Sequence, residues 1–537
     1  MSSVQEKKPL TATYTPLSSL RAQQRSRWSS QTKRYARGGA VLVIMFVFWG
    51  AIFTSMRALR GYDTSKIETK HAESFPGATD LITELYGKPD TYTSRLFSGY
   101  LPIGNGGQAF YFYAESLGEK PQQDPVLLWL NGGPGASSLA GCFSENGPLI
   151  VNDDSQSLRV NEHAWNTNAN FLCIESPVGV GFSYNISGVY ESDDLRQADE
   201  LYLAVQQFFV KFPWLRENDF IISGESYGGV YVPTTAKRIV EGNLAGEAKI
   251  NLKKFVVGNG ANEFLSLSKV LYGYYHGLIS TQEYEAIRSA CPELKEFEPT
   301  PQLEANSICQ KALSEYDEQV LNTAVNSYNV IGKCAGNPQS GIEKMVQELI
   351  EPMRGFPHPV AMTLGLCLNS TKLISYFNLP VVRQNMHTKL EIDHWSNIAL
   401  TSASIDIAAL APAAGVDPQM VKHKVLGFNV TLGMVVTPLW KYLVEHDVQG
   451  VIYHGDADMQ CDFIGGLWAV ESLGLPRKQG RQAWTVTLDG SDQVAGFFED
   501  FGPIQYVTVK GAGHMVPETN PIEAKKLLDL FVLDKQL

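Results

Sequence analysis

The segment that most constrains the fold is Gly224–Gly228, which has the sequence G-E-S-Y-G and centres on Ser226. The apolar run Phe220–Ile222 before it predicts a buried strand, and Thr234–Val240 after it can form a helix. A sharp turn from strand to helix requires small residues beside the serine, because neighbouring backbone crowds the turn. The pattern therefore predicts strands packed against helices, with Ser226 at the carboxyl end of a strand and its hydroxyl open for nucleophilic attack.

Three further loops follow apolar runs in a consistent order. A glycine-rich loop, Asn131–Ser138, follows an early run, Gly455–Asp458 follows a later one, and a C-terminal loop presents His514 after Tyr506–Val509. A glycine loop after an early strand can supply backbone N–H groups to an oxyanion hole. Each loop alone could be an ordinary turn. Together, the chain order serine, aspartate, histidine is that of α/β-hydrolases.

Apolar runs alternate with helical patterns along much of the chain, which predicts a mostly parallel, doubly wound sheet. The segment from about 262 to 430 interrupts this rhythm, and we interpret it as an inserted helical lid. The expected elements are a hairpin over 100–114, strands at 124–130, 171–175, 220–223, 255–258, 448–453 and 506–509, and helices over 193–211 and 522–533.

Separated motifs in this chain resemble those of the serine carboxypeptidases, over roughly residues 85 to 535. They are W-L-N-G-G-P-G at 129–135, E-N-G-P at 145–148, E-S-P-V-G-V-G-F-S-Y at 175–184, G-E-S-Y-G-G at 224–229, G-N-G at 258–260, G-D-A-D at 455–458 and G-H-M-V-P at 513–517. The resemblance implies an α/β-hydrolase fold and an enzyme that releases C-terminal amino acids from peptides, with no metal or organic cofactor.

The resemblance also implies roles for single residues. Ser226 matches the family nucleophile and His514 its base. The acid matches Asp458, the second aspartate of G-D-A-D, whereas the residues by themselves leave Asp456 equally open. The oxyanion donors correspond to the backbone N–H groups of Gly133 and Tyr227.

The residues with which the family binds the terminal carboxylate of the substrate correspond to four residues here: Asn131, Gly132, Glu145 and Glu225. Two carboxyls side by side resist ionising together, so the pKa of one rises and the pair shares a proton. A protonated carboxyl can donate a hydrogen bond to a carboxylate. We therefore expect substrate binding at acid pH that weakens as the pH rises through the apparent pKa of the pair. Ala140 and Ser144 lie where the family shapes the pocket for the leaving residue, and both are small.

In a lumenal protein, clustered cysteines predict disulfides. Two disulfides of open connectivity are expected within a cluster of four: Cys291, Cys309, Cys334 and Cys367. Buried thiols are expected at the other three: Cys142, Cys173 and Cys461. Because Ala136 stands where the family often has cysteine, we expect no disulfide to anchor the glycine-rich loop. No C-x-x-C pair occurs, so a zinc site is not expected.

The N-terminal region differs in composition from the rest. Residues 1–37 are basic and polar, which predicts a disordered tail, and 38–56 carry no charge over a length that can cross a bilayer. The positive-inside rule places the tail in the cytosol, leaving a linker over 57–84 and the catalytic domain over 85–537 in the lumen. A cleaved signal peptide and a buried core helix are the alternatives. Sequons that agree with a secretory route lie at Asn185, Asn369 and Asn429.

Composition excludes some classes of protein. The chain has 537 residues, 44% of them hydrophobic, and a net charge of −12. That charge argues against a nucleic-acid partner. Together, the resemblance and the N-terminal region imply a serine-type carboxypeptidase with an acid pH preference, a type II membrane protein of the secretory or vacuolar pathway that acts on peptide or protein C-termini. An acyltransferase of the same fold and an anchored binding protein without catalysis remain as alternatives. Its oligomeric state is left open.

Overall fold

The structure, a computed structural model, describes residues 75–292, 307–322, 325–334, 367, 370–389, 392, 394–397, 400–401 and 425–535. These residues belong to one compact unit, Ser74–Leu537. The predicted basic tail, the predicted membrane span and most of the predicted linker lie outside the described residues. Among the helices that are described, none combines the length and the apolar character needed to cross a membrane.

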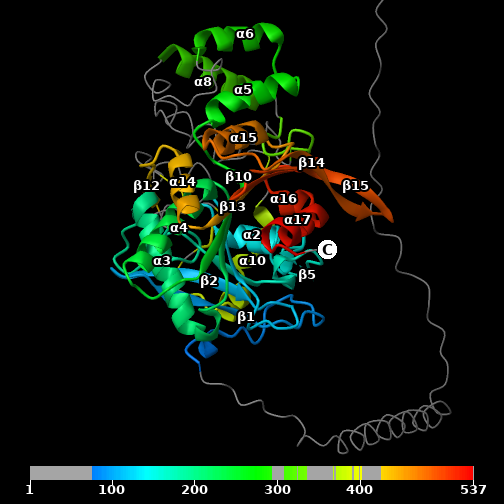
Figure 1. Ribbon diagram of the computed structural model, residues 1–537. Helices are drawn as coiled ribbons and strands as arrows, with labels where there is room; N and C mark the ends of the chain where they lie inside the picture. The colour runs from blue at the N-terminus through cyan, green and yellow to red at the C-terminus, as the bar shows by residue number, and fades with distance from the viewer. Residues whose placement is uncertain are drawn as a thin grey trace, which may run out of the picture. The chain divides into compact units, whose positions relative to one another are not determined.

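A large sheet runs through the described part of the chain, with the strand order β1-β2-β6-β3-β9-β10-β13-β16-β15-β14, and β7 pairs with β2 (Figure 1). The run from β6 to β16 is parallel, and antiparallel hairpins extend both ends. The predicted mostly parallel sheet is confirmed. Its strands are β1 (Leu96–Pro102), β2 (Gly107–Ala114), β3 (Val126–Leu130), β6 (Asn170–Ile174), β7 (Tyr184–Asn185), β9 (Phe220–Ser226), β10 (Leu252–Gly260), β13 (Gln449–Gly455), β14 (Gln479–Leu488), β15 (Ser491–Asp500) and β16 (Ile504–Val509).

The central strands are apolar on both faces because helices cover both faces. In β3, Leu128 and Leu130 pack into one hydrophobic cluster, while Leu127 and Trp129 pack into the cluster on the opposite face. Successive side chains of a strand point to opposite faces, so a strand buried on both sides is continuously hydrophobic. This explains why the central strands appear in the sequence as continuous runs of apolar residues and not as alternating apolar and polar residues.

Two helical layers enclose the sheet (Figure 1). One layer contains α3 (Asp194–Lys211), α4 (Gly228–Leu244), α14 (Thr437–Glu445) and α15 (Phe463–Ser472). The other contains α2 (Ser138–Ser144), α10 (Thr371–Phe377), α16 (Val516–Thr519) and α17 (Pro521–Leu527), after which Leu528–Val532 forms a π-helical turn. Helix α3 begins as predicted, because the Asp193 side chain accepts hydrogen bonds from the N–H groups of Leu195 and Arg196.

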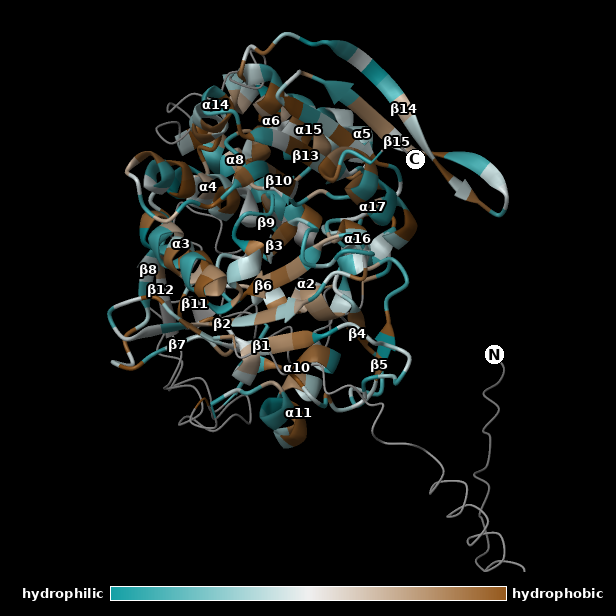
Figure 2. Cartoon of the chain, turned by 60° about the horizontal axis from the view of Figure 1, so that its bottom comes forward, coloured by the Kyte–Doolittle hydropathy of each residue, from teal (hydrophilic) through white to brown (hydrophobic). Residues whose placement is uncertain are grey.

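The described parts of the expected lid lie in two places. Helices α5 (Leu265–Tyr275), α6 (Thr281–Ala290) and α8 (Ser307–Asn322) gather beside α15 at one end of the molecule. Helices α10 and α11 (Pro380–Asn385) lie far from them, and α10 packs against α2 (Figures 1 and 2). The chain then returns through β12 (Val425–Asn429), which pairs with β8 (Glu191–Asp193). Smaller strands are β4 (Leu149–Val151), β5 (Leu158–Val160) and β11 (Leu400–Thr401).

The β14–β15 hairpin was not predicted from the sequence. It extends away from the helical layers in Figure 2, and most side chains of β14 are exposed. A solvated hairpin needs no hydrophobic run, which is the signal that identified the other strands. Asp489 and Gly490 both have positive φ at the turn, and an Asp-Gly pair between two strand patterns is typical of such hairpins.

The disulfides confirm one cysteine prediction and correct another. The cluster of four pairs as Cys291–Cys309 and Cys334–Cys367, and Cys461 is a buried thiol, both as expected. The prediction of buried thiols at Cys142 and Cys173 is wrong, because these two residues form a third disulfide. Helix α2 packs against β6, and this tertiary contact brings together two cysteines 31 positions apart. A disulfide therefore does secure the helix that follows the glycine-rich loop. Three disulfides fit an oxidising, lumenal compartment.

Candidate active site

Ser226 ends strand β9, and helix α4 begins two residues later. Its φ is +61°, a left-handed conformation that costs a non-glycine residue energy and that the surrounding structure must hold in place. Ser226 O accepts a hydrogen bond from the Ala261 N–H at 2.8 Å. A Cβ at Gly229 would approach the backbone of Ala261 within 2.7 Å, so glycine is required beside the turn. The predicted strand, serine and helix are all present.

The remaining site loops come from the same edge of the sheet. Strands β3, β9, β13 and β16 are parallel, and each is followed at its carboxyl end by one of the site segments. In open α/β sheets, this is the edge at which ligands bind. The topology thus brings together loops that lie almost 400 positions apart in the chain.

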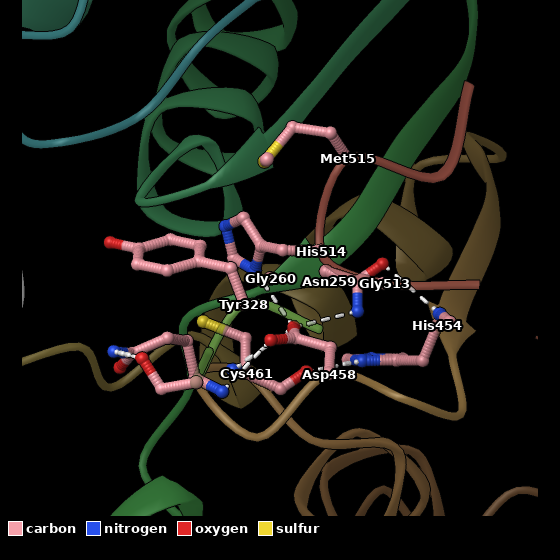
Figure 3. A network of polar contacts seen from close by, with 12 residues as sticks. Asn259, Gly260, Tyr328, His454, Asp458, Cys461, Gly513, His514 and Met515 are labelled. Carbon is pink, nitrogen blue, oxygen red and sulfur yellow. Dashed lines mark hydrogen bonds and ion pairs between the residues drawn. The ribbon is translucent and has the colours of Figure 1, made fainter. Parts of the chain in front are cut away.

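Asp458 and His514 face each other, with Asp458 Oδ2 2.7 Å from His514 Nδ1. Asp458 has no exposed surface, and its carboxylate also accepts hydrogen bonds from Asn259 Nδ2 at 2.8 Å and from the N–H groups of Gln460 and Cys461 (Figure 3). These donors offset the cost of burying the carboxylate. A proton on Nδ1 satisfies this contact, so Nε2 is free to accept one; it has no hydrogen-bond partner in the described part of the chain.

Asp456 has a different environment. Its Oδ1 accepts a hydrogen bond from the Gly511 N–H at 2.6 Å. The structure therefore sets Asp458, and not Asp456, against the imidazole of His514. Sequence reasoning without the family resemblance could not choose between the two, because both follow the same strand.

A short segment of the predicted lid packs against the histidine. The Tyr328 carbonyl accepts a hydrogen bond from the His514 N–H at 2.7 Å, and the two rings meet edge to face with centroids 4.9 Å apart (Figure 3). The neighbouring Ser327 carbonyl accepts hydrogen bonds from the N–H groups of Met459 and Gln460. These lid residues were not predicted from the sequence, since no motif marks them, and Asn259 had no predicted role although it lies within G-N-G.

The glycine-rich loop, Asn131–Ser138, directly contacts the turn around the serine, Gly224–Gly228, which is called the serine turn below. A Cβ at Gly132 would overlap the backbone nitrogen of Tyr227, so only glycine allows this approach. Gly133 follows with φ +106°. The backbone of Gly133 and that of Tyr227 consequently border the same space beside Ser226, and both residues line the cavity there.

Two buried glutamates meet at Asn131. The Asn131 Nδ2 donates to Glu225 Oε1 at 2.8 Å and to Glu145 Oε1 at 3.3 Å, while its Oδ1 accepts from Trp129 Nε1 and from the Gly141 N–H. Only 4% of Glu145 and 3% of Glu225 are exposed. Burial raises the pKa of Glu145, and the charge of Glu518 adds to the rise. Burial, together with the charge of Glu145, raises the pKa of Glu225. Such a pair holds a proton well above the usual carboxyl range.

These groups line one cavity of about 400 Å³. Ser226 and His514 lie along its wall together with both glutamates. Ala140 and Ser144 line it as well, and their small side chains leave room there. The cavity can hold the end of a peptide, with a terminal carboxylate near the glutamates and a carbonyl near the serine.

The predicted sequons differ in accessibility. Asn429 is exposed at the end of β12. Asn185 is only 8% exposed, and its Nδ2, the atom that would carry a glycan, donates to the Asn105 carbonyl. Asn369 lies outside the described residues. Over the described ranges, no group of three or more histidine, cysteine or acidic side chains is placed to bind a metal ion.

Comparison with known proteins identifies the family. The model of the serine carboxypeptidase family matches residues 87–534. The chain is 31% identical to the lysosomal protective protein of Mus musculus, covering 84% of this chain and 93% of that protein, and 31% identical to the serine carboxypeptidase ctsa-4.1 of Caenorhabditis elegans, covering 85% and 94%. It is 32% identical to the serine carboxypeptidase-like 26 protein of Oryza sativa subsp. japonica, covering 85% and 91%.

Among solved structures, the chain resembles that of Kex1Δp, a prohormone-processing carboxypeptidase from Saccharomyces cerevisiae. The TM-score is 0.64 at 22% identity, and the match covers 84% of this chain and 94% of the yeast chain. This likeness confirms the predicted α/β-hydrolase fold. The chain belongs to the serine carboxypeptidase family, and its function is that of a serine-type carboxypeptidase.

Proposed function

We propose that Ser226, His514 and Asp458 form the catalytic triad with which this chain releases C-terminal amino acids from peptides and proteins. The observation that carries the proposal is the 2.7 Å contact between Asp458 Oδ2 and His514 Nδ1, on the wall of the cavity that Ser226 also lines. With Nδ1 committed to Asp458, Nε2 can accept the Ser226 proton as Oγ attacks the last peptide carbonyl. The same proton then passes to the leaving amino acid, and water hydrolyses the acyl-enzyme.

The oxyanion of the tetrahedral intermediate binds the N–H groups of Gly133 and Tyr227. Both border the cavity beside Ser226, where the glycine-rich loop contacts the serine turn. Donors fixed in advance stabilise charge that exists only in the transition state, so they accelerate the reaction without tightening substrate binding.

The Glu145–Glu225 pair, with Asn131 and the Gly132 backbone, binds the substrate's terminal carboxylate. The binding-competent form is the one that retains a proton, because two ionised glutamates would repel a carboxylate. Burial raises the pKa of both groups, and the charge of Glu145 raises that of Glu225 further. Binding is therefore complete at acid pH and is lost as the pH rises through the apparent pKa of the pair.

A peptide assay with the full-length chain tests this function. Peptides with a free C-terminus are incubated at acid pH beside the same peptides as C-terminal amides, and the products are identified by mass. Stepwise loss of C-terminal residues from the free peptides, with little cleavage of the amides, is expected. Equal cleavage of both would contradict the proposed binding of the terminal carboxylate and favour an acyltransferase or esterase.

The segment 38–56 serves as an uncleaved anchor, with the tail 1–37 in the cytosol and the catalytic domain in the lumen. The uncharged length of the segment supports this topology, as do the basic residues before it. The three disulfides and the exposed sequon at Asn429 agree with a lumenal domain. Asn429 is the sequon most accessible for glycosylation in the described part of the chain.

A further inference from the structure

A buried carboxylate outside the proposed triad contacts the serine turn. Asp194, the first residue of α3, has no exposed surface. Its Oδ1 accepts a hydrogen bond from Tyr227 Oη at 2.7 Å. Its Oδ2 accepts from the N–H groups of Thr431 and Leu432 at 2.8 and 2.9 Å, and from Thr431 Oγ1 at 3.2 Å. Its donors come from two segments some 200 positions apart, the serine turn and the chain that returns from the insertion.

Aromatic contacts fix the ring of Tyr227 from two further sides. Its ring meets Tyr231 edge to face at 5.2 Å and Phe428 of β12 at 6.0 Å. Tyr231 Oη in turn accepts a hydrogen bond from the N–H of Gly135 in the glycine-rich loop. Strand β12 lies beside β8, which leads directly into α3 (Figure 2). The serine turn, the glycine-rich loop and the returning chain therefore share one buried cluster.

We propose that Asp194 is a positioning residue for the reaction: through the Tyr227 hydroxyl it holds the Tyr227 backbone N–H in line with the oxyanion, and it makes that alignment depend on the docking of residues 431–432. The inference rests on the proposed oxyanion role of Tyr227. Burial and the charge of Asp194 raise the pKa of the Tyr227 phenol, which keeps its proton and donates throughout the working pH range.

The loss of this contact has a definite kinetic signature. Without its hydroxyl anchor, residue 227 can shift between the strained Ser226 and the start of α4. A misaligned oxyanion donor weakens transition-state stabilisation and leaves substrate binding intact, so kcat falls while KM does not change. Complete loss of an oxyanion donor costs about 10²–10³ in kcat, and misalignment should cost roughly tenfold.

Glu263 offers a matched control. Its carboxylate accepts hydrogen bonds from the N–H groups of Val436 and Thr437 and from Thr437 Oγ1, in the same returning chain. These partners lie at the start of α14 and not at the serine turn. Glu263→Gln therefore weakens the anchoring of the returning chain as Asp194→Asn does, but leaves Tyr227 untouched.

The experiment compares Tyr227→Phe, Asp194→Asn and Glu263→Gln in the full-length chain. Steady-state kinetics on a peptide with a free C-terminus are measured, together with the inhibition constant of a peptide aldehyde, whose hemiacetal places an oxygen in the oxyanion hole. Tyr227→Phe and Asp194→Asn should lower kcat about tenfold with KM within about twofold, and weaken aldehyde inhibition by a similar factor. Adding Tyr227→Phe to Asp194→Asn should cause little further loss.

Glu263→Gln should keep kcat within about twofold of wild type, even if its unfolding midpoint falls. Wild-type kcat in Tyr227→Phe, or the same loss of kcat in Glu263→Gln, would overturn the inference. If Asp194→Asn fails to fold, Tyr227→Phe decides alone. Ser226→Ala in the same assay separates this inference from the proposed function, because an active Ser226→Ala rejects the triad, whereas an inactive one beside a fully active Tyr227→Phe rejects only the role of Asp194.

Discussion

At the scale of single residues, buried carboxyls around one cavity have different roles because their partners differ. Asp458 accepts hydrogen bonds from four donors, including His514, and is fixed as an acceptor. Glu145 and Glu225 share the amide of Asn131, and each has one oxygen without a hydrogen-bond partner among the described residues. These environments suit the proposed roles, in which Asp458 orients a base and the two glutamates share a proton.

The proposed nucleophile, Ser226, gives the first prediction. Ser226→Ala should lower kcat by about 10⁴ or more, because triad members act as a unit. Steady-state hydrolysis of a free peptide measures the loss. A serine-reactive organophosphate should label wild type at Ser226 and leave the variant unlabelled, as peptide mass mapping would reveal. Activity within tenfold of wild type would reject this serine as the nucleophile.

The two aspartates of G-D-A-D provide a matched comparison. Asp458→Asn should lose several orders of magnitude in kcat, because an amide in place of Oδ2 no longer holds the proton on His514 Nδ1. Asp456→Asn should lose far less, since its described contact is with the Gly511 N–H. Both variants are assayed on one peptide at one pH. The opposite ranking would mean that the acid is two residues from its assigned place.

The glutamate pair predicts a pH effect. In wild type, kcat/KM for free peptides should fall as the pH rises through the raised pKa of the pair. Glu225→Gln keeps a hydrogen-bond donor but cannot ionise, so its kcat/KM should depend less on pH, at some cost in acid activity. The full pH profile of both proteins tests this. Parallel profiles would show that the pair does not control binding.

At the scale of elements, the features predicted from the sequence are those marked by local pattern, and the features missed depend on contacts between distant segments. The serine turn, the buried strands and helix α3 follow from periodicity and turn chemistry. The contact between Tyr328 and His514 does not, because the two residues are far apart in the chain and meet only through the fold. Only the family resemblance selected Asp458 as the proposed acid, since Asp456 and Asp458 both follow the same strand.

The disulfide between α2 and β6 is an element-scale feature with a stability consequence. Replacing both cysteines, Cys142→Ala with Cys173→Ala, should lower the free energy of unfolding by about 4 kcal/mol, given the 31-residue separation that the bond closes. Denaturant unfolding without reductant compares the variant with wild type. As a control, mass mapping of unreduced wild type should find the two cysteines linked. Free thiols at both positions would contradict the pairing.

At the scale of the whole molecule, the sheet explains how loops that are far apart in the sequence come together in one site. Parallel strands β3, β9, β13 and β16 present their carboxyl ends at one edge, so insertions between them do not separate the site loops. The insertion after β10 instead contributes to the site, through Tyr328 and through the chain that returns at β12.

The proposed orientation of the chain across a membrane gives the last prediction. The basic residues before segment 38–56 favour a cytosolic N-terminus, and the disulfides agree with an oxidising compartment around the catalytic domain. Protease added to sealed microsomes should therefore trim only about the first forty residues, because the bilayer shields the span and the lumenal domain. Detergent should expose the catalytic domain, which serves as the control, and tags at each end report the two regions separately. Digestion of the catalytic domain in sealed vesicles would reject the orientation, and a mature N-terminus beyond Met56 would show that the segment is a cleaved signal peptide.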